Sequence, residues 1–198
     1  MRRRGRESGT SAKVWMSVFI GLLMVMSVFG IIIGSQSSDI RYGGVKFTQE
    51  DSVYKAKIKG REVHFYTLPF ESNYLNFSKS DFDIINSSSF IITSFDPAAA
   101  NESAPAIELA RFDMATMMTD KLFLNGVIAP SPGYESLPVI GCPNATASSP
   151  AVIFNTSDSA GVVASGNCVY LNGRGADFLR IRDRLIYYYY GVVQNESG

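Results

Sequence analysis

The sequence predicts an N-terminal transmembrane helix followed by a small α/β or α+β ectodomain, built from one mixed sheet with two main helices packed on it. Three observations predict this fold class. Residues 14–34 form an uncharged apolar run, short strand-like runs follow it, and residues 104–124 and 175–191 have helical periodicity. The chain has 198 residues, of which 46% are hydrophobic. This composition excludes a disordered chain, and the length suits one domain with an appendage.

Charge is distributed unevenly along the chain. The 18 basic and 18 acidic residues cancel, but residues 1–13 carry a net charge of +4, residues 14–34 carry none, and residues 35–198 carry −4. An apolar helix over 14–34 would rise about 31 Å, close to the roughly 30 Å hydrocarbon core of a bilayer. We therefore expect an uncleaved signal anchor in the cell membrane that contacts the lipid bilayer. Residues 1–13 are then a cytoplasmic basic tail, and the C-terminal domain is extracellular.

Residues 14–34 also allow three alternatives to a signal anchor to be compared. A cleaved signal peptide has an apolar region of about 7–15 residues and a small-x-small site, which Ile33-Gly34-Ser35 fits poorly. A buried soluble helix would not be apolar on every face beside a basic cluster. A pilin-like filament subunit predicts a glutamate early in the apolar helix, and residues 14–34 contain none.

Potential N-glycosylation sites support the external assignment. Six Asn-x-Ser/Thr tripeptides with a non-proline middle residue follow the apolar run, and none precedes it. Several of these positions fall in apparent loops, where the glycan of a glycoprotein could be solvated, whereas Asn155 directly follows a strand-like run. The acceptor asparagines are Asn76, Asn86, Asn101, Asn144, Asn155 and Asn195.

Both cysteines, Cys142 and Cys168, lie in the part predicted to be external. Oxidation is expected in that compartment, so we predict a structural disulfide. Closing a loop of this size is worth about 3.5 kcal/mol in the chain-entropy model. Two free thiols, or a catalytic cysteine with His64, are the alternatives.

The external part begins with a polar, Gly-rich linker at residues 35–46, and the domain itself spans 47–198. Residues 53–68 alternate between apolar and charged side chains around Lys59-Gly60-Arg61, which predicts a hairpin with one wet face. Residues 90–97 are a continuous apolar run, typical of a buried central strand. Further short strands are expected at residues 137–142, 151–155 and 167–173.

Two helices complete the domain. Ser103 and Pro105 open the first, over residues 104–124. The second begins near Gly175 and ends at Gly191, with an apolar stripe on one side. Its wet side is expected to carry Asp177, Arg180, Arg182, Asp183 and Arg184.

Two places near strand ends are weak candidates for ligand binding. Ser94 and Asp96 end the 90–97 strand, where α/β sheets place ligands, although Asp96-Pro97 also fits a simple turn. Arg174 lies between two glycines where a strand meets a helix, so an anion could bind there, and a tight turn explains the same residues.

No catalytic set can be identified. The chain lacks the Gly-x-Ser-x-Gly, His-Glu-x-x-His and phosphate-loop patterns. A single histidine, His64, makes a multi-histidine metal centre impossible, and it fits a structural or surface role better than that of a base. We therefore expect no catalytic residue, no metal and no cofactor.

The stretches GCPNAT, GNCVYLNG and DRLIYYYYGV, together with the basic signal anchor, resemble uncharacterised archaeal membrane-anchored surface proteins. The resemblance covers about the last third of the chain and the anchor. It implies an N-glycosylated ectodomain on the side of the surface layer, with Cys142 paired to Cys168. It implies no activity.

The functional expectation is a single-pass membrane protein whose external domain binds or assembles with components of the cell envelope without catalysis. Its partner would be another envelope protein or a second copy, and no nucleic acid is expected. The main alternative is a membrane-anchored, hydrolase-like ectoenzyme with a site near Asp96.

Overall fold

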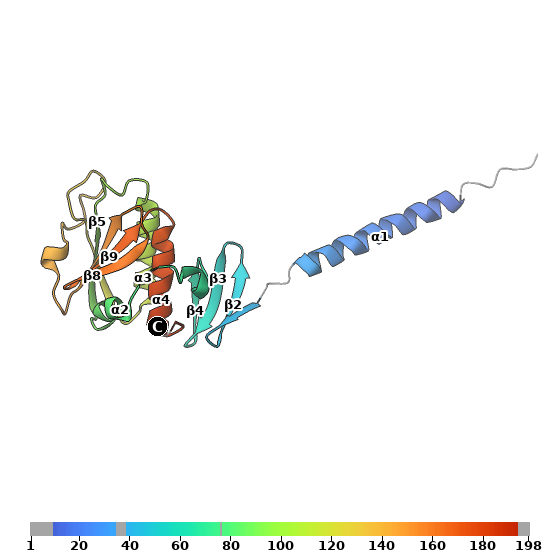
Figure 1. Cartoon of the computed structure of the whole chain (residues 1–198). Coiled ribbons are helices and arrows are strands. Elements are labelled where there is room, and N and C mark those ends of the chain that lie inside the picture. Colours follow the sequence, from blue (N-terminus) through green and yellow to red (C-terminus); the bar gives the residue numbers. More distant parts are fainter. Residues whose placement is uncertain (1–9, 35–38, 76, 194–198) are drawn as a thin grey trace, which may run out of the picture. The chain divides into compact units, whose positions relative to one another are not determined.

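The computed structural model of the chain describes residues 10–34, 39–75 and 77–193. The chain divides into two compact units, Met1–Ser38 and Asp39–Gly198 (Figure 1). The described part of the second unit contains two β-sheets and three α-helices, and helix α1 belongs to the first unit.

Helix α1 (Thr10–Gly34) covers the apolar run. Its described side chains run from Val14 to Val28, and all of them are exposed. Within the described residues, no helix is both long and apolar enough to cross a membrane. The predicted transmembrane helix at residues 14–34 is therefore corrected: the segment is helical, but the structure does not support it as a span.

The first sheet of the second unit is an antiparallel meander. Tight turns connect its strands: Gly43 and Gly44 both have positive φ, as do Lys59 and Gly60, which is the conformation that two-residue hairpin loops need. The hairpin predicted at residues 53–68 is confirmed. The strands, in chain order and in spatial order, are β1 (Asp39–Tyr42), β2 (Val45–Glu50), β3 (Val53–Ile58) and β4 (Arg61–Phe65).

The second sheet has five strands in the order β6-β5-β7-β9-β8. Strands β6, β5, β7 and β9 run parallel to one another, and β8 runs antiparallel beside β9. The central strands are buried on both faces, which explains the continuous apolar runs in their sequences. The strands are β5 (Phe90–Phe95), β6 (Leu122–Asn125), β7 (Ala151–Thr156), β8 (Gly161–Ser165) and β9 (Cys168–Gly173).

The prediction of a single sheet is wrong. Strands β1 to β4 pair only in sequential hairpins, whereas β5 is flanked by β6 and β7, which come later in the chain. Strand β1 also lies within residues 35–46, the segment predicted as a linker, so the hairpin of β1 and β2 was not predicted. The domain therefore has two separate apolar sheet faces that need burial.

Three helices bury these faces: α2 (Lys79–Asn86), α3 (Ala104–Met117) and α4 (Asp177–Tyr190). Helices α3 and α4 correspond to the two main helices predicted, and α2 adds a third. The first helix was predicted to reach residue 124, but α3 ends at Met117 and residues 122–124 belong to β6. Ser78 caps α2, because its hydroxyl accepts a hydrogen bond from the backbone N–H of Asp81. Helix α3 packs against α4, and both α2 and α4 contact β9.

Helix α4 lies between the two sheets (Figure 1). On one side Tyr187 stacks on Phe65 of β4, with 4.2 Å between ring centroids. On another side Phe178 meets Phe154 of β7 at 5.7 Å. The predicted wet side of this helix is therefore partly wrong, because the first sheet covers it: Arg182 and Asp183 are both completely buried.

The other face of the second sheet is covered by the segment from residue 126 to residue 150. A strand predicted at residues 137–142 is absent from the described structure there. Only Val139 forms an isolated bridge, to Val127, and a short 3-10 helix, η2 (Cys142–Asn144), follows. The predicted disulfide between Cys142 and Cys168 is confirmed, and it ties η2 to the start of β9.

Candidate binding surface

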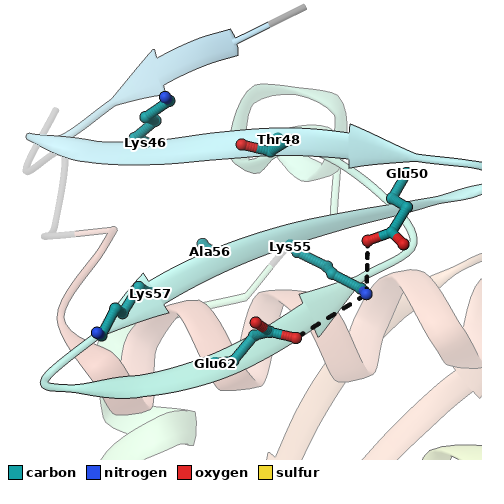
Figure 2. Close-up of a pocket in the computed structure, with 7 residues that line it drawn as sticks. All are labelled: Lys46, Thr48, Glu50, Lys55, Ala56, Lys57 and Glu62. Carbon is teal, nitrogen blue, oxygen red and sulfur yellow. Dashed lines mark ion pairs between the residues drawn. The ribbon is translucent and has the colours of Figure 1, made fainter. Parts of the chain in front are cut away.

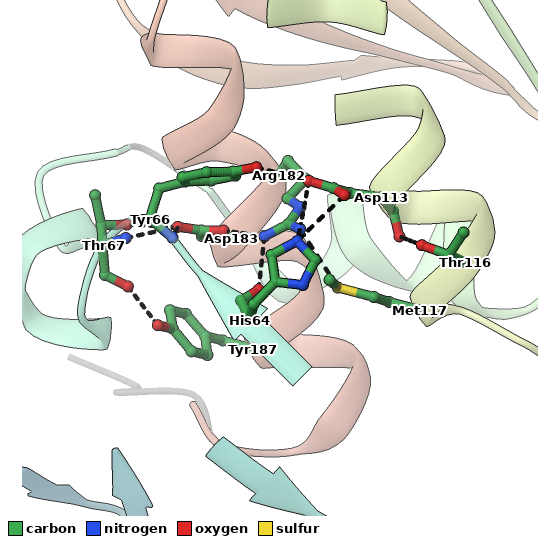
Figure 3. Close-up of polar contacts among 9 residues, drawn as sticks. All are labelled: His64, Tyr66, Thr67, Asp113, Thr116, Met117, Arg182, Asp183 and Tyr187. Atoms are coloured by element: carbon green, nitrogen blue, oxygen red, sulfur yellow. Dashed lines mark hydrogen bonds and ion pairs between the residues drawn. The ribbon is translucent and has the colours of Figure 1, made fainter. Parts of the chain in front are cut away.

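A buried polar network attaches the first sheet to the helices (Figure 3). Asp183 of α4 accepts hydrogen bonds from the backbone N–H groups of Tyr66 and Thr67, at 2.7 and 2.8 Å, and from the Thr67 hydroxyl at 3.0 Å. Tyr187, one turn further along α4, donates its hydroxyl to the Thr67 carbonyl. The chain leaving β4 is thus held by side chains of α4.

Arg182 is the centre of the network. Its guanidinium contacts Asp183, pairs with Asp113 of α3 at 2.6 Å, and donates to the backbone carbonyl of His64 at 3.0 Å. The His64 ring lies 3.3 Å from Asp113, and the Tyr66 hydroxyl donates to the same carboxylate at 3.3 Å. One arginine therefore joins α3, α4 and β4.

Burial controls the ionisation of this network. Removal from water raises the pKa of Asp183 to about 6, although Arg182 and the donors of Thr67 act in the opposite direction. Burial also raises the pKa of the Tyr187 hydroxyl above its ordinary value. In the described structure these contacts hold the end of the first sheet against α3 and α4.

The opposite face of the first sheet is exposed and charged. It contains an open hollow of about 350 Å³ over strands β2, β3 and β4 (Figure 2). Lys55 crosses the hollow to Glu50 at 2.5 Å and approaches Glu62 at 3.9 Å. The residues that line it are Lys46, Thr48, Glu50, Lys55, Ala56, Lys57 and Glu62.

Three basic side chains follow one another across this face. Arg41 of β1 lies opposite Lys46 of β2 in the register. Phe47 of β2 lies opposite Ala56 of β3, so Lys46 and Lys57, one residue away on their antiparallel strands, are neighbours as well. We call Arg41, Lys46 and Lys57 the cation row. All three are exposed. Like charges on neighbouring strands repel one another, so this arrangement costs stability.

The cation row is only partly neutralised. Asp39 pairs with Lys46 at 2.7 Å, and this hydrogen bond lowers the pKa of Asp39, which keeps the carboxylate ionised. Glu62 lies opposite Lys57 in the register, but its ion pair is with Lys55. Among the described residues, Lys57 has no ion pair. The cation row can therefore accept an anionic group from a partner.

The residues predicted as weak ligand sites do not form one site. Ser94 is fully buried, and its hydroxyl donates to the Ile140 carbonyl at 2.6 Å. Asp96 accepts a hydrogen bond from the backbone N–H of Ala98, which is the turn that Asp-Pro suggested. Arg174 pairs with Asp158 at 3.0 Å beside a crevice. The alternative of an enzymatic site near Asp96 stays a prediction.

The predicted glycosylation sites differ in their surroundings. Asn86, Asn101, Asn144 and Asn155 are exposed, whereas Asn76 and Asn195 lie outside the described residues. Asn155 donates its side-chain amide to Asn172 at 2.7 Å, so a glycan there would replace that hydrogen bond. The other three described asparagines make no comparable donation.

The cation row and the buried network are absent from the sequence-based candidates. The alternation of Lys55, Lys57 and Lys59 predicts a solvent-exposed strand face. Lys46 lies on the same face of the sheet but in the neighbouring strand β2, which was not predicted. The predicted surface position of Arg182 and Asp183 is wrong because the sequence does not show that the first sheet packs over α4. No metal site was expected, and the described residues contain no group of three histidine, cysteine, aspartate or glutamate side chains that could hold an ion.

Comparison with known proteins gives no relative from which function could be transferred. No family model matches the chain, and no curated protein or solved structure is significantly similar to it. The resemblance to archaeal surface proteins accordingly stays a prediction.

Proposed function

We propose that residues 39–198 form a non-catalytic recognition domain outside the cytoplasm that binds an anionic polysaccharide of the cell envelope. The observation that carries this proposal is the cation row on the open face of the first sheet. Its three cations lie side by side, and Lys57 has no ion pair in the described structure. An anionic polymer would relieve the repulsion between them and place several acidic groups along the row.

The chemistry of the hollow favours a carbohydrate over a lipid surface. Insertion into a bilayer requires large apolar side chains, and none lines the hollow. The Thr48 hydroxyl and the Glu50 carboxylate can instead bond sugar hydroxyls, while the lysines hold acidic groups.

The location outside the cytoplasm is supported by the disulfide. Structural disulfides persist in oxidising compartments and are rare in the cytosol. The exposure of four acceptor asparagines is consistent with the same location.

A charge-reversal experiment tests the function. The full chain is titrated calorimetrically with dextran sulfate and with neutral dextran, before and after the double change Lys46→Glu and Lys57→Glu. We expect binding to dextran sulfate only, weakened by salt, and a loss of about tenfold or more in the double variant.

The matched control reverses two other exposed cations, Lys79→Glu and Arg180→Glu, which changes the net charge equally. Both lie on helices, in pairs with Asp83 and Asp177. We expect this control to keep its affinity within about threefold. Equal losses in the two double variants, or no binding by the unmodified chain, would reject the proposal.

A further inference from the structure

A separate crevice lies at the carboxyl ends of the parallel strands of the five-stranded sheet. It has a volume of about 550 Å³, which is within the range of small-molecule sites. Its walls come from the loop after β5, the end of β7 and the turn after β9. The lining residues are Ala99, Asn101, Glu102, Ser103, Thr156, Arg174 and Gly175.

The topology places this crevice where α/β sheets bind ligands. From β5 the chain crosses to β6 on one side, while β7 continues to β9 on the other side. The direction of the connections therefore reverses between β5 and β7. Ligands of open α/β sheets bind outside the carboxyl ends of the strands at such a point.

The polar groups at the crevice are incompletely satisfied within the chain. The Thr156 hydroxyl is covered yet has no hydrogen-bond partner in the described structure, which is uncommon for a buried polar atom. Ser103 is buried, and its hydroxyl accepts from the backbone N–H of Gly175 at 2.9 Å, which leaves its own proton available. Asn101 and Glu102 add exposed polar side chains at the same wall.

The crevice offers one cationic side chain to an anionic group, Arg174, beside the carboxylate of Glu102. Arg174 is 62% exposed, and its partner Asp158 is 87% exposed, so this ion pair is weak and readily exchanged. An arginine can bind phosphate or carboxylate through two parallel hydrogen bonds. The neighbouring hydroxyl, amide and carboxylate groups suit the hydroxyls of a sugar.

We propose that this crevice binds a small acidic sugar, with its anionic group on Arg174 and its hydroxyls toward Ser103, Glu102 and Thr156. The site is distinct from the cation row, and it does not depend on the polysaccharide proposal. It also differs from the predicted site at Asp96, which does not line the crevice.

Three probes test this site by titration calorimetry: glucose 6-phosphate, glucose and inorganic phosphate. The full chain is produced in a host that does not glycosylate, so that Asn101 carries no glycan. We expect glucose 6-phosphate to bind saturably and at least tenfold more tightly than glucose or inorganic phosphate. Its sugar and its phosphate contact different side chains of the crevice, so both contribute to the affinity. No saturable binding of glucose 6-phosphate would overturn the proposal.

Substitutions locate the binding. Arg174→Ala should weaken binding about tenfold or more, and the near-isosteric Thr156→Val should weaken it severalfold. Lys79→Ala removes one exposed cation from α2, outside the cation row, and serves as the control, with no change expected. Equal weakening by Arg174→Ala and Lys79→Ala would show non-specific attraction and would also overturn the proposal.

Discussion

The guanidinium of Arg182 and the carboxylate of Asp113 lie 2.6 Å apart, and both side chains are buried between the two sheets. Removing one partner of a buried ion pair typically costs about 3–5 kcal/mol, and the loss of Asp113 leaves Arg182 with the carboxylate of Asp183. Asp113→Ala should therefore lower the free energy of unfolding by about this amount, as measured by urea denaturation.

The exposed pair of Arg180 and Asp177 provides the comparison for that substitution. Removing a solvent-exposed ion pair changes stability by less than about 1 kcal/mol. If Arg180→Ala and Asp113→Ala cost the same, the buried network does not hold the first sheet on the helices.

Asp183 gives the domain a pH dependence with a defined sign. Its pKa in the folded chain is about 6, above its ordinary value of 3.8. Its contribution to stability is therefore fully present below about pH 4 and is lost as the pH rises through 6, to an extent of up to about 3 kcal/mol.

The Asp183→Asn variant isolates this effect, because the amide does not titrate. As the pH falls from 7 to 4, the unfolding free energy of the unmodified chain should rise relative to that of the Asp183→Asn variant. A difference that stays constant over this range would show that the carboxylate keeps an ordinary pKa.

The disulfide should stabilise the domain mainly through the unfolded chain. It closes a loop between residues 26 positions apart, which corresponds to about 3.5 kcal/mol. The double change Cys142→Ala and Cys168→Ala should lower the unfolding free energy by about that amount. An unchanged urea midpoint would mean that the native state is strained or that the unfolded chain is already compact.

Glycan occupancy should follow the local hydrogen bonds. In the native host, Asn86 and Asn144 are expected to be modified, whereas Asn155 is expected to stay free because its amide is engaged by Asn172. Mass spectrometry of tryptic glycopeptides measures this directly. Full occupancy at Asn155 with none at Asn86 and Asn144 would contradict this order.

Much of the fold follows from local sequence patterns. The continuous apolar runs of β5 and β7, the helix start at Pro105 and the left-handed helix end at Gly191 are all local signals, and each matches the structure. The Gly191 end is a Schellman motif, with the N–H of Val192 bonded to the carbonyl of Tyr187.

The remaining features depend on contacts between distant segments. The burial of Arg182 requires the first sheet to cover α4, and no local pattern of α4 contains that information. In the same way, the cation row requires the register of β1, β2 and β3, whereas alternation within a single strand shows only which face is wet.

The most direct test of the central proposal is to map where an anionic polysaccharide binds. Backbone amide shifts of the full chain are recorded by NMR during titration with short dextran sulfate fragments, with dextran as the neutral reference. The proposal predicts that the largest shifts fall on β1, β2 and β3 around Arg41, Lys46 and Lys57, and that dextran causes none. Shifts that spread evenly over all exposed basic residues, or that leave these strands unchanged, would contradict it.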